Sequence, residues 1–187
     1  MTMNISAATS HPPSPQSIQT EVVTFAFGMT SLGQVLVAAT AKGICAILLG
    51  SDRKRLASDL RQHFPQAQAA PDAGLANAVA RVQAIVENPA TPFDLELDLF
   101  GSDFEIKVWT ALRIVPAGET LSYSDLAERV GLKGVAKAAK DVADACASNR
   151  LAVAVPCHRI RRKDGTISGY RWGVHRKRAL LAREGVL

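Results

Sequence analysis

The segment SYSDLAERVGLKGVAKAAKDVADACASNRLAVAVPCHRI, residues 122–160, decides the fold of the C-terminal half of the chain. It begins with Ser122 and Asp125 at the spacing of a capping box, and Gly131 is placed to end a short helix in a left-handed conformation. A second, alanine-rich helix is predicted over 135–149, after a short glycine-containing turn. Such a pair is typical of a helix-turn-helix, whose second helix meets a DNA duplex. Many helical proteins contain two such helices without a DNA role, so the spacing alone leaves both interpretations open.

The apolar run LAVAV, residues 151–155, predicts a buried β-strand that carries Pro156 and Cys157 at its end. A basic, glycine-bearing loop follows over residues 159–173. The last helix is predicted over residues 174–187, with two leucines facing inward and a glycine as its stop signal: Leu180, Leu181 and Gly185.

The first half of the chain has the pattern of a small α/β unit. Three β-rich runs over residues 24–49 predict a meander. A helix with a buried stripe of Leu56, Leu60 and Phe64 is predicted over 51–64, and a second helix from Leu75 to Val86. Alternating apolar residues over 93–99 predict a strand with one buried face.

The composition changes near Gly101, where Ser102 and Glu105 give another capping-box signal, for a helix that Pro116 ends. We therefore expect an α/β protein in three parts: a disordered tail at 1–20, an N-terminal α/β domain at 21–100, and a mostly helical catalytic and DNA-binding domain at 101–187.

Composition restricts the class of protein. The 187 residues carry a formal net charge of +5, which suits an anionic partner but also fits a merely basic surface. The three cysteines lie far apart and show neither metal-binding nor disulfide spacing, so we expect no metal, no cofactor and a reducing cytoplasmic location. No apolar stretch approaches the roughly 20 residues of a membrane span, so no membrane partner is expected.

Cys157 is followed directly by His158. A thiol attacks as a thiolate, which requires a base or a positive charge nearby. Adjacent residues of an extended chain point to opposite sides, so His158 would act through a water or after a turn of the chain. Glu184 is a candidate to orient the imidazole. The alternative interpretation, a buried structural cysteine, is the one that we assign to Cys45 and Cys146.

Four strings now point to one family: VWTALRIVPAGETLSYSDLA (108–127), SNRLAVAV (148–155), PCHRI (156–160) and SGYRWG (168–173). Together they closely resemble the O6-alkylguanine-DNA alkyltransferases, also called methylated-DNA–protein-cysteine methyltransferases. The resemblance begins near Glu21 and is strongest after residue 104. It implies a ribonuclease-H-like N-terminal fold beside a helical domain with a helix-turn-helix.

The resemblance also implies a reaction. Cys157 would take the alkyl group from O6 of guanine, and less readily from O4 of thymine, and keep it, so that the protein is consumed. His158 would remove the thiol proton through a water, Glu184 would orient His158, and Asn149 would be the hinge between the helix and the active-site segment. Tyr123 would contact the lesion's 3′ phosphate and base and assist flipping. The partner is double-stranded DNA containing alkylated guanine, and we expect a monomer.

The family also implies a substrate pocket. The backbone carbonyls of Cys157 and Ile160 would accept hydrogen bonds from the guanine amine, and backbone groups near Arg171 would meet O6. Tyr170 and Trp172 would form the pocket wall. Because Trp172 is bulky, methyl lesions are expected to react faster than benzyl ones.

One position departs from the family. Its members carry an arginine in the alanine-rich helix that enters the duplex and fills the space of the flipped base. Counting back from Cys157 points to Lys140 and counting forward from Tyr123 points to Lys137. The two counts differ by three, so a three-residue insertion is expected between Gly131 and Ala145. Both lysines are candidates, with Arg159 as a further DNA-binding cation. A lysine lacks the planar guanidinium, so flipping should be less well supported.

Two carboxylates on the same helix, Asp141 and Asp144, would repel phosphates unless they pair with the lysines at helical spacing. This helix keeps open a second function, a sensor that binds alkylated DNA and repairs it weakly or not at all. A cysteine hydrolase is a third, less favoured possibility, because it would need a second histidine in a suitable motif.

Overall fold

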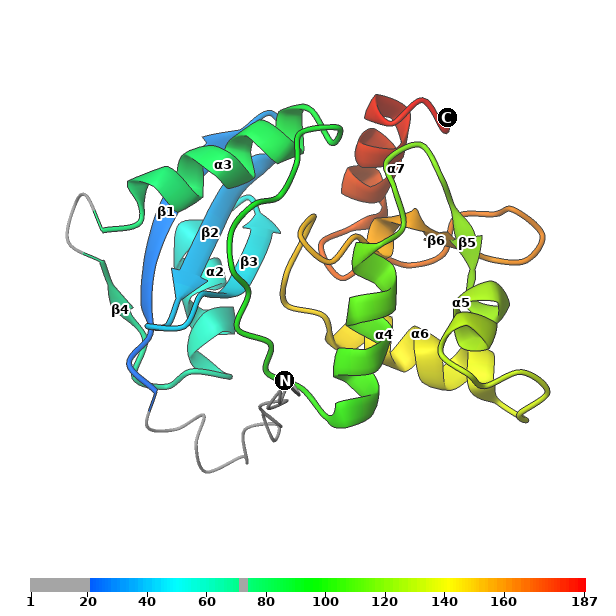
Figure 1. Ribbon diagram of the computed structural model, residues 1–187. Helices are drawn as coiled ribbons and strands as arrows, with labels where there is room; N and C mark the ends of the chain where they lie inside the picture. The colour runs from blue at the N-terminus through cyan, green and yellow to red at the C-terminus, as the bar shows by residue number, and fades with distance from the viewer. Residues whose placement is uncertain (1–20, 71–73) are drawn as a thin grey trace, which may run out of the picture.

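The computed structural model describes residues 21–70 and 74–187, so the expected tail at 1–20 lies outside the described residues. The described chain has a mixed α/β fold, with a sheet and two helices on one side and the remaining helices on the other (Figure 1). Within these ranges, no helix is both long enough and apolar enough to cross a membrane.

The predicted meander is present. β1 (Thr24–Thr30), β2 (Gly33–Ala39) and β3 (Ile44–Gly50) pair antiparallel in sequence order. A short strand that the sequence analysis did not predict, β4 (Gln68–Ala69), adds parallel to β1 and completes the order β3-β2-β1-β4. At the other edge, β3 makes a single bridge to Leu151 of the C-terminal part.

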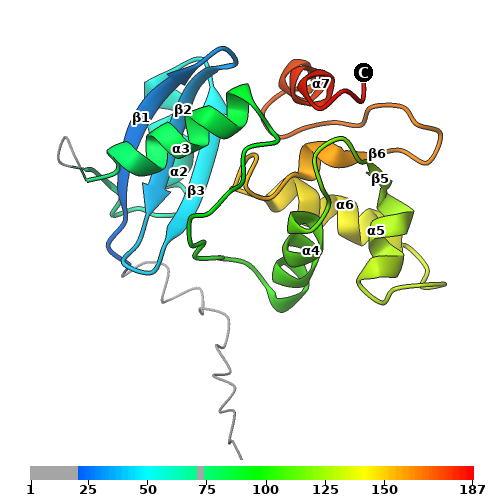
Figure 2. The same cartoon turned by 45° about the horizontal axis from the view of Figure 1, so that its top comes forward.

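Two helices cover the sheet, α3 (Ala76–Glu87) on one face and α2 (Arg53–Arg61) on the other (Figures 1 and 2). The side chain of Asp52 caps α2 by accepting a hydrogen bond from the Arg55 amide. Most of the predicted inward residues are buried, namely Leu56 and Leu60 of α2, Phe64 just after it, and Val79, Val82 and Val86 of α3. Leu75, which was also expected to face inward, is the N-cap of α3 and is only partly buried.

The predicted strand over 93–99 is wrong. The segment has no regular secondary structure, and only one bridge, between Leu97 and Ile44, joins it to the sheet. The alternation of apolar and polar residues reflects burial instead, because the apolar side chains of this segment lie against the core. Its backbone forms no further bridge within the described residues. Periodicity reports which side chains are buried, not which backbone groups are paired.

Both predicted capping boxes form. Ser102 and Glu105 cap α4 (Asp103–Arg113), and Ser122 and Asp125 cap α5 (Tyr123–Arg129). Each serine side chain accepts from the amide three residues on, and each carboxylate accepts from the serine amide. These caps fix where α5, and therefore Tyr123 at its first position, begins.

The alanine-rich helix is shorter than predicted. Gly131, at φ 83°, ends the preceding helix as expected, but α6 (Ala138–Ser148) begins three residues later than the predicted start at Val135. Lys137 lies before α6 in a left-handed conformation at φ 64°. The connection between α5 and α6 is therefore longer than predicted, and Lys137 is not on the helix.

The predicted strand over 151–155 is also wrong. After α6 the chain turns, with Val153 at φ 60°, and then enters a 3₁₀ turn over Cys157–Arg159. A short apolar run indicates burial but does not distinguish a strand from a buried turn. β6 (Ile160–Arg161) follows and pairs parallel with β5 (Leu121–Ser122).

The last helix, α7 (Val174–Arg183), lies beside the C-terminal end of α3 and contacts the 3₁₀ turn (Figure 2). Leu180 and Leu181 are fully buried, and Gly185 follows at φ 71°, both as predicted. Glu184, directly after α7, is thereby brought to the segment that carries Cys157.

Candidate active site

Cys157 begins the 3₁₀ turn and lies at a cavity of about 270 Å³. The 3₁₀ conformation turns the chain directly after Cys157, but no hydrogen bond joins His158 to the Cys157 sulfur within the described residues. The cavity is built by α5, α6 and the loop before α7, and its lining residues are Tyr123, Ala143, Cys146, Ala147, Cys157, Gly169, Tyr170 and Arg171. Cys146 therefore shares the cavity with Cys157, although the sequence analysis treated it as structural only.

Asn149 joins α6 to this turn. Its side-chain amide donates to the carbonyl of Val155 at 2.9 Å and to the sulfur of Cys157 at 3.3 Å, and its Oδ1 accepts from the Leu151 amide at 2.8 Å. The residue is fully buried. Asn149 thus holds the turn and also places a donor on the sulfur, where it favours the thiolate.

His158 and Glu184 form a buried pair. His158 Nε2 lies 2.8 Å from Glu184 Oε1, and the side chains are 1% and 0% exposed. Burial would raise the pKa of Glu184, but hydrogen bonds from His158 and Arg159 outweigh it and hold the pKa below its usual value. An ionised carboxylate can only accept, so Nε2 carries the proton and Nδ1 of a neutral ring is the basic nitrogen.

His158 Nδ1 is buried and bonds to no protein atom of the described residues. Burial lowers the pKa of His158 below its usual 6.5, and the bond to Glu184 opposes this only in part. The imidazole is therefore neutral at pH 7 and has one unoccupied basic nitrogen, as a general base requires.

Arg159 does not lie where a DNA-binding cation would. Its guanidinium donates to both oxygens of Glu184, the shortest contact being 2.9 Å, and to the carbonyl of Val115. The residue is only 8% exposed. The 3₁₀ turn directs this side chain inward, and we reassign Arg159 from DNA contact to holding the Glu184 carboxylate.

A second chain of hydrogen bonds links Tyr123 to α7. The Tyr123 hydroxyl lies 2.7 Å from Ser168 Oγ, which accepts from Lys177 Nζ at 2.9 Å. Lys177 also donates to the carbonyl of Ile160, at 2.5 Å. This carbonyl was expected to receive the guanine amine, and only its second lone pair is free for that role.

Lys177 and Ser168 were not among the predicted site residues. Lys177 is three and four residues before Leu180 and Leu181, so the helical period placed it on the buried face of α7; no pattern singled out Ser168. Burial lowers the pKa of Lys177 to about 8, and the nearby Cys157 and Cys146 oppose this.

The pKa of Cys157 reflects two opposing influences. Burial raises it, while the Asn149 amide and the positive charge of Lys177 lower it, and burial outweighs them. At pH 7 the resting group is the thiol, so reaction requires a base. His158 is the buried base next to it.

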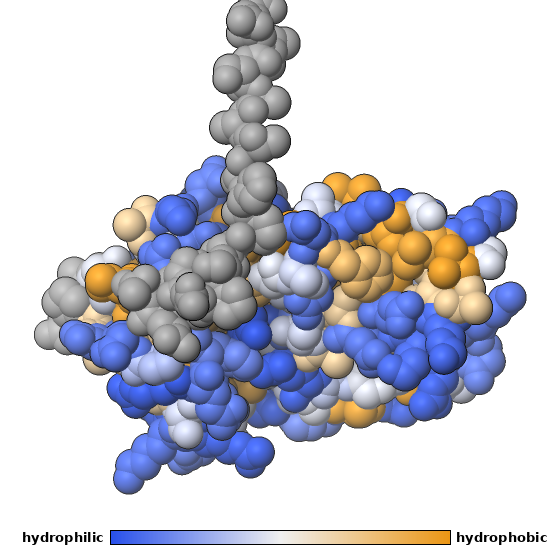
Figure 3. All heavy atoms as spheres, turned by 90° about the horizontal axis from the view of Figure 1, so that it is seen from below, coloured by the Kyte–Doolittle hydropathy of each residue, from blue (hydrophilic) through white to orange (hydrophobic). Residues whose placement is uncertain are grey.

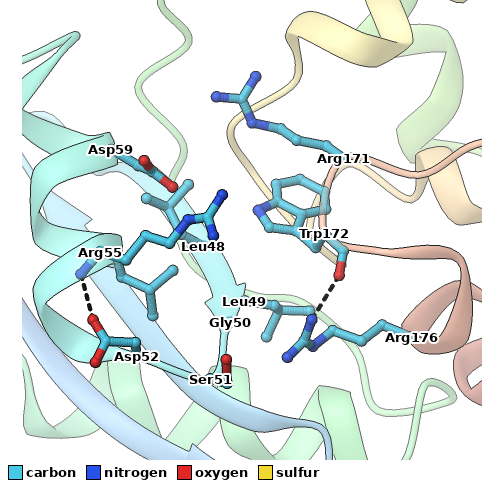
Figure 4. A pocket seen from close by; sticks show the side chains of 11 residues that line it. Leu48, Leu49, Gly50, Ser51, Asp52, Arg55, Asp59, Arg171, Trp172 and Arg176 are labelled. Atoms are coloured by element: carbon cyan, nitrogen blue, oxygen red, sulfur yellow. Dashed lines mark hydrogen bonds between the residues drawn. The ribbon is translucent and has the colours of Figure 1, made fainter.

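Of the two aromatic residues expected to form the pocket wall, only Tyr170 does so. Tyr170 lines the Cys157 cavity, and its ring meets that of Trp172 edge to face at 5.1 Å. Trp172 and Arg176 line a separate cavity of about 250 Å³ against α2, while Arg171 borders both cavities (Figure 4). Trp172 therefore lies behind Tyr170, and we reassign the limit on adduct size to Tyr170.

The two candidate finger lysines are both exposed. Lys140 Nζ forms an ion pair with Asp144 at 2.6 Å along α6, the pairing that the helical spacing required. Lys137 precedes α6, on the connection from α5. The structure therefore places one lysine on the helix, beside a carboxylate, and the other on the connection.

Comparison with known proteins identifies the same family that the sequence resembles. A model of the 6-O-methylguanine DNA methyltransferase DNA-binding domain matches residues 103–186. The chain is 50% identical over 163 residues to the bifunctional transcriptional activator/DNA repair enzyme Ada of Escherichia coli, covering 87% of this chain and 45% of that protein. It is 44% identical over 115 residues to methylated-DNA–protein-cysteine methyltransferase of Mycobacterium tuberculosis, covering 61% of this chain and 68% of that protein. The chain spans less than half the length of the Ada protein.

Solved structures agree in fold. The crystal structure of Mycobacterium tuberculosis O6-methylguanine methyltransferase superposes with a TM-score of 0.71 at 33% identity, covering 87% of this chain and 93% of that one. The same enzyme in complex with DNA superposes with a TM-score of 0.71 at 32% identity, covering 86% and 92%. The likeness extends over the sheet and the helices together, and it shows that this chain belongs to the methylated-DNA–protein-cysteine methyltransferase family.

Proposed function

We propose that this protein repairs DNA directly, by moving a methyl or larger alkyl group from O6 of guanine in double-stranded DNA to the sulfur of Cys157. The observation that carries the proposal is the buried His158–Glu184 pair beside a cysteine that lines a cavity. The relatives support it, since they are named as DNA repair enzymes and methyltransferases and one solved relative is bound to DNA.

The step balances as a displacement at carbon. Nδ1 of His158 takes the thiol proton, directly or through a water, and the sulfur forms a bond to the alkyl carbon as the carbon–oxygen bond breaks. The electron pair stays on guanine, which leaves as an anion. Tyr123 can stabilise this leaving group with a hydrogen bond, and Ser168 and Lys177 hold its hydroxyl. The thioether has no route back to a thiol, so each molecule acts once.

DNA would reach the cavity along the face that carries α5 and α6. We assign these two helices as the helix-turn-helix of residues 101–187, and residues 21–100 as the ribonuclease-H-like domain of a cytoplasmic monomer. Seen from this side, hydrophobic side chains gather on the part of the molecule that holds α4–α6 (Figure 3). A base stacked in a duplex hides O6, so the nucleotide must flip into the cavity.

The alternative functions gain no support. A sensor that binds lesions without repair needs no nucleophile, yet Cys157 has a base and a hydrogen-bond donor in place. A hydrolase would regenerate its thiol. Counting the lesions repaired separates the three: we expect repair to stop at one O6-methylguanine for each protein molecule. Continued turnover would indicate a hydrolase, and binding without repair a sensor.

The finger assignment has its own test. Replacing both Lys137 and Lys140 with alanine should slow repair of duplex more than reaction with free O6-methylguanine. It should also reduce the salt slope of duplex binding by about one for each lysine that pairs with a phosphate. Lys54→Ala, on the exposed side of α2, is the matched control. Equal slowing on both substrates would contradict a role in base flipping.

A further inference from the structure

Two arginines on one face of α7 connect this helix to the N-terminal sheet. Arg176 and Arg183 are seven residues apart, two helical turns. Arg176 Nε donates to the carbonyl of Leu32 at 2.9 Å. Arg183 donates to Ser31 Oγ and to the carbonyl of Val86. The β1–β2 turn and the end of α3 are thus both joined to α7.

Glu87, the last residue of α3, links these groups to one another. Its carboxylate accepts from the Ser31 amide at 2.7 Å and from the Ser31 hydroxyl at 2.6 Å, and it lies 3.6 Å from the Arg183 guanidinium. The Ser31 hydrogen bonds, aided by Arg183, hold the pKa of Glu87 below its usual value. We call Ser31, Glu87 and Arg183 the clamp.

Arg183 of the clamp directly precedes Glu184 of the His158–Glu184 pair. Arg183 closes α7, and Glu184 is the next residue, with its carboxylate fully buried on His158. A shift or rotation at the end of α7 would therefore move Glu184 relative to His158 Nε2. Ion pairs at the surface contribute little to the free energy of unfolding, and Glu87 is partly exposed. Its contacts are therefore better explained as fixing the place of Arg183 than as stabilising the fold.

We propose that the clamp is a positioning device for the His158–Glu184 pair, by which the N-terminal sheet sets the basicity of the imidazole that activates Cys157. This inference rests on the proposed function for its meaning in repair. It assigns Ser31, Glu87 and Arg183 as positioning residues, since none of them lines the Cys157 cavity.

The test compares Arg183→Met with Arg178→Met, an exposed arginine on the same helix. Arg183→Met should slow methyl transfer to Cys157 about tenfold, move the midpoint of the pH profile and shift the NMR signals of the His158 ring, because small displacements of catalytic groups are costly. Arg178→Met should leave all three unchanged, and Arg183→Lys should recover part of the rate.

Ser31→Ala provides a variant outside α7. It removes the hydroxyl that bonds to Arg183 and Glu87 but keeps the amide bond to Glu87, so it should give a smaller change of the same kind. Variants that lose thermal stability but keep the wild-type pH midpoint and His158 signals would overturn the proposal.

A third readout separates this proposal from the proposed function. Reaction of Cys157 with iodoacetamide needs no DNA, so its pH dependence reports the activation of the Cys157 thiol without any contribution from DNA binding or base flipping. A wild-type protein that repairs nothing would refute the repair function, and a shifted iodoacetamide profile in Arg183→Met would still uphold the clamp. An unshifted profile would overturn the clamp even if repair is confirmed.

Discussion

His158→Gln is expected to slow methyl transfer at pH 7 by about 10²-fold or more, the usual contribution of a positioned general base. As the pH decreases past 6.5, the wild-type rate should stay constant, because burial keeps the imidazole neutral. The rate should decrease only when the pH reaches the lowered pKa of His158. In the variant the thiol must ionise unaided. Since the pKa of Cys157 is raised, the rate should keep rising with pH through pH 9.

The control is His175→Gln, which removes an exposed histidine at the start of α7 and should leave the profile unchanged. Stopped or quenched single-turnover kinetics from pH 5 to 10 with methylated duplex would record both profiles. A His158→Gln rate within threefold of wild type and with the same pH dependence would show that His158 is not the base.

Asn149→Ala is expected to lower the free energy of unfolding by about 1–3 kcal/mol, because it leaves the buried Leu151 amide without a partner and removes one of the two hydrogen bonds to the Val155 carbonyl. It also removes the donor on the Cys157 sulfur, so the thiol pKa should rise further. Denaturant unfolding and the pH dependence of thiol alkylation measure the two effects.

Ser148→Ala, one residue earlier, removes a hydrogen bond to the carbonyl of Ala145 and one to the carboxylate of Glu105, both of which keep other partners, and should change stability by less than about 1 kcal/mol. If Asn149→Ala were no more destabilising than Ser148→Ala, the hinge assigned to Asn149 would be wrong.

Local signals in the sequence predicted most of the fold. The capping boxes at Ser102 and Ser122 and the glycine stop at Gly131 are correct, because each depends only on residues within one helical turn. The strands predicted over 93–99 and 151–155 are wrong, because strand pairing depends on a partner that is distant in sequence and leaves no local signal.

In the candidate site, too, the features with a local sequence signal were predicted and those that depend on tertiary packing were not. The residues alone made Cys157, His158 and Glu184 candidates, and the resemblance supplied their roles and added Asn149. The direction of the Arg159 side chain depends on the 3₁₀ turn, which the apolar run before it did not indicate. Lys177 could have been found, since it occupies a buried position of the α7 period, whereas the position of Trp172 depends on packing against α2.

The most direct test is the intact mass of the protein before and after incubation with duplex DNA containing O6-methylguanine, followed by peptide mapping. The account predicts a stoichiometric gain of about 14 Da, located on Cys157 and absent in Cys157→Ser, because the sulfur keeps the methyl group. An unchanged mass while the lesion disappears, or a gain mapped to Cys45 or Cys146, would contradict it.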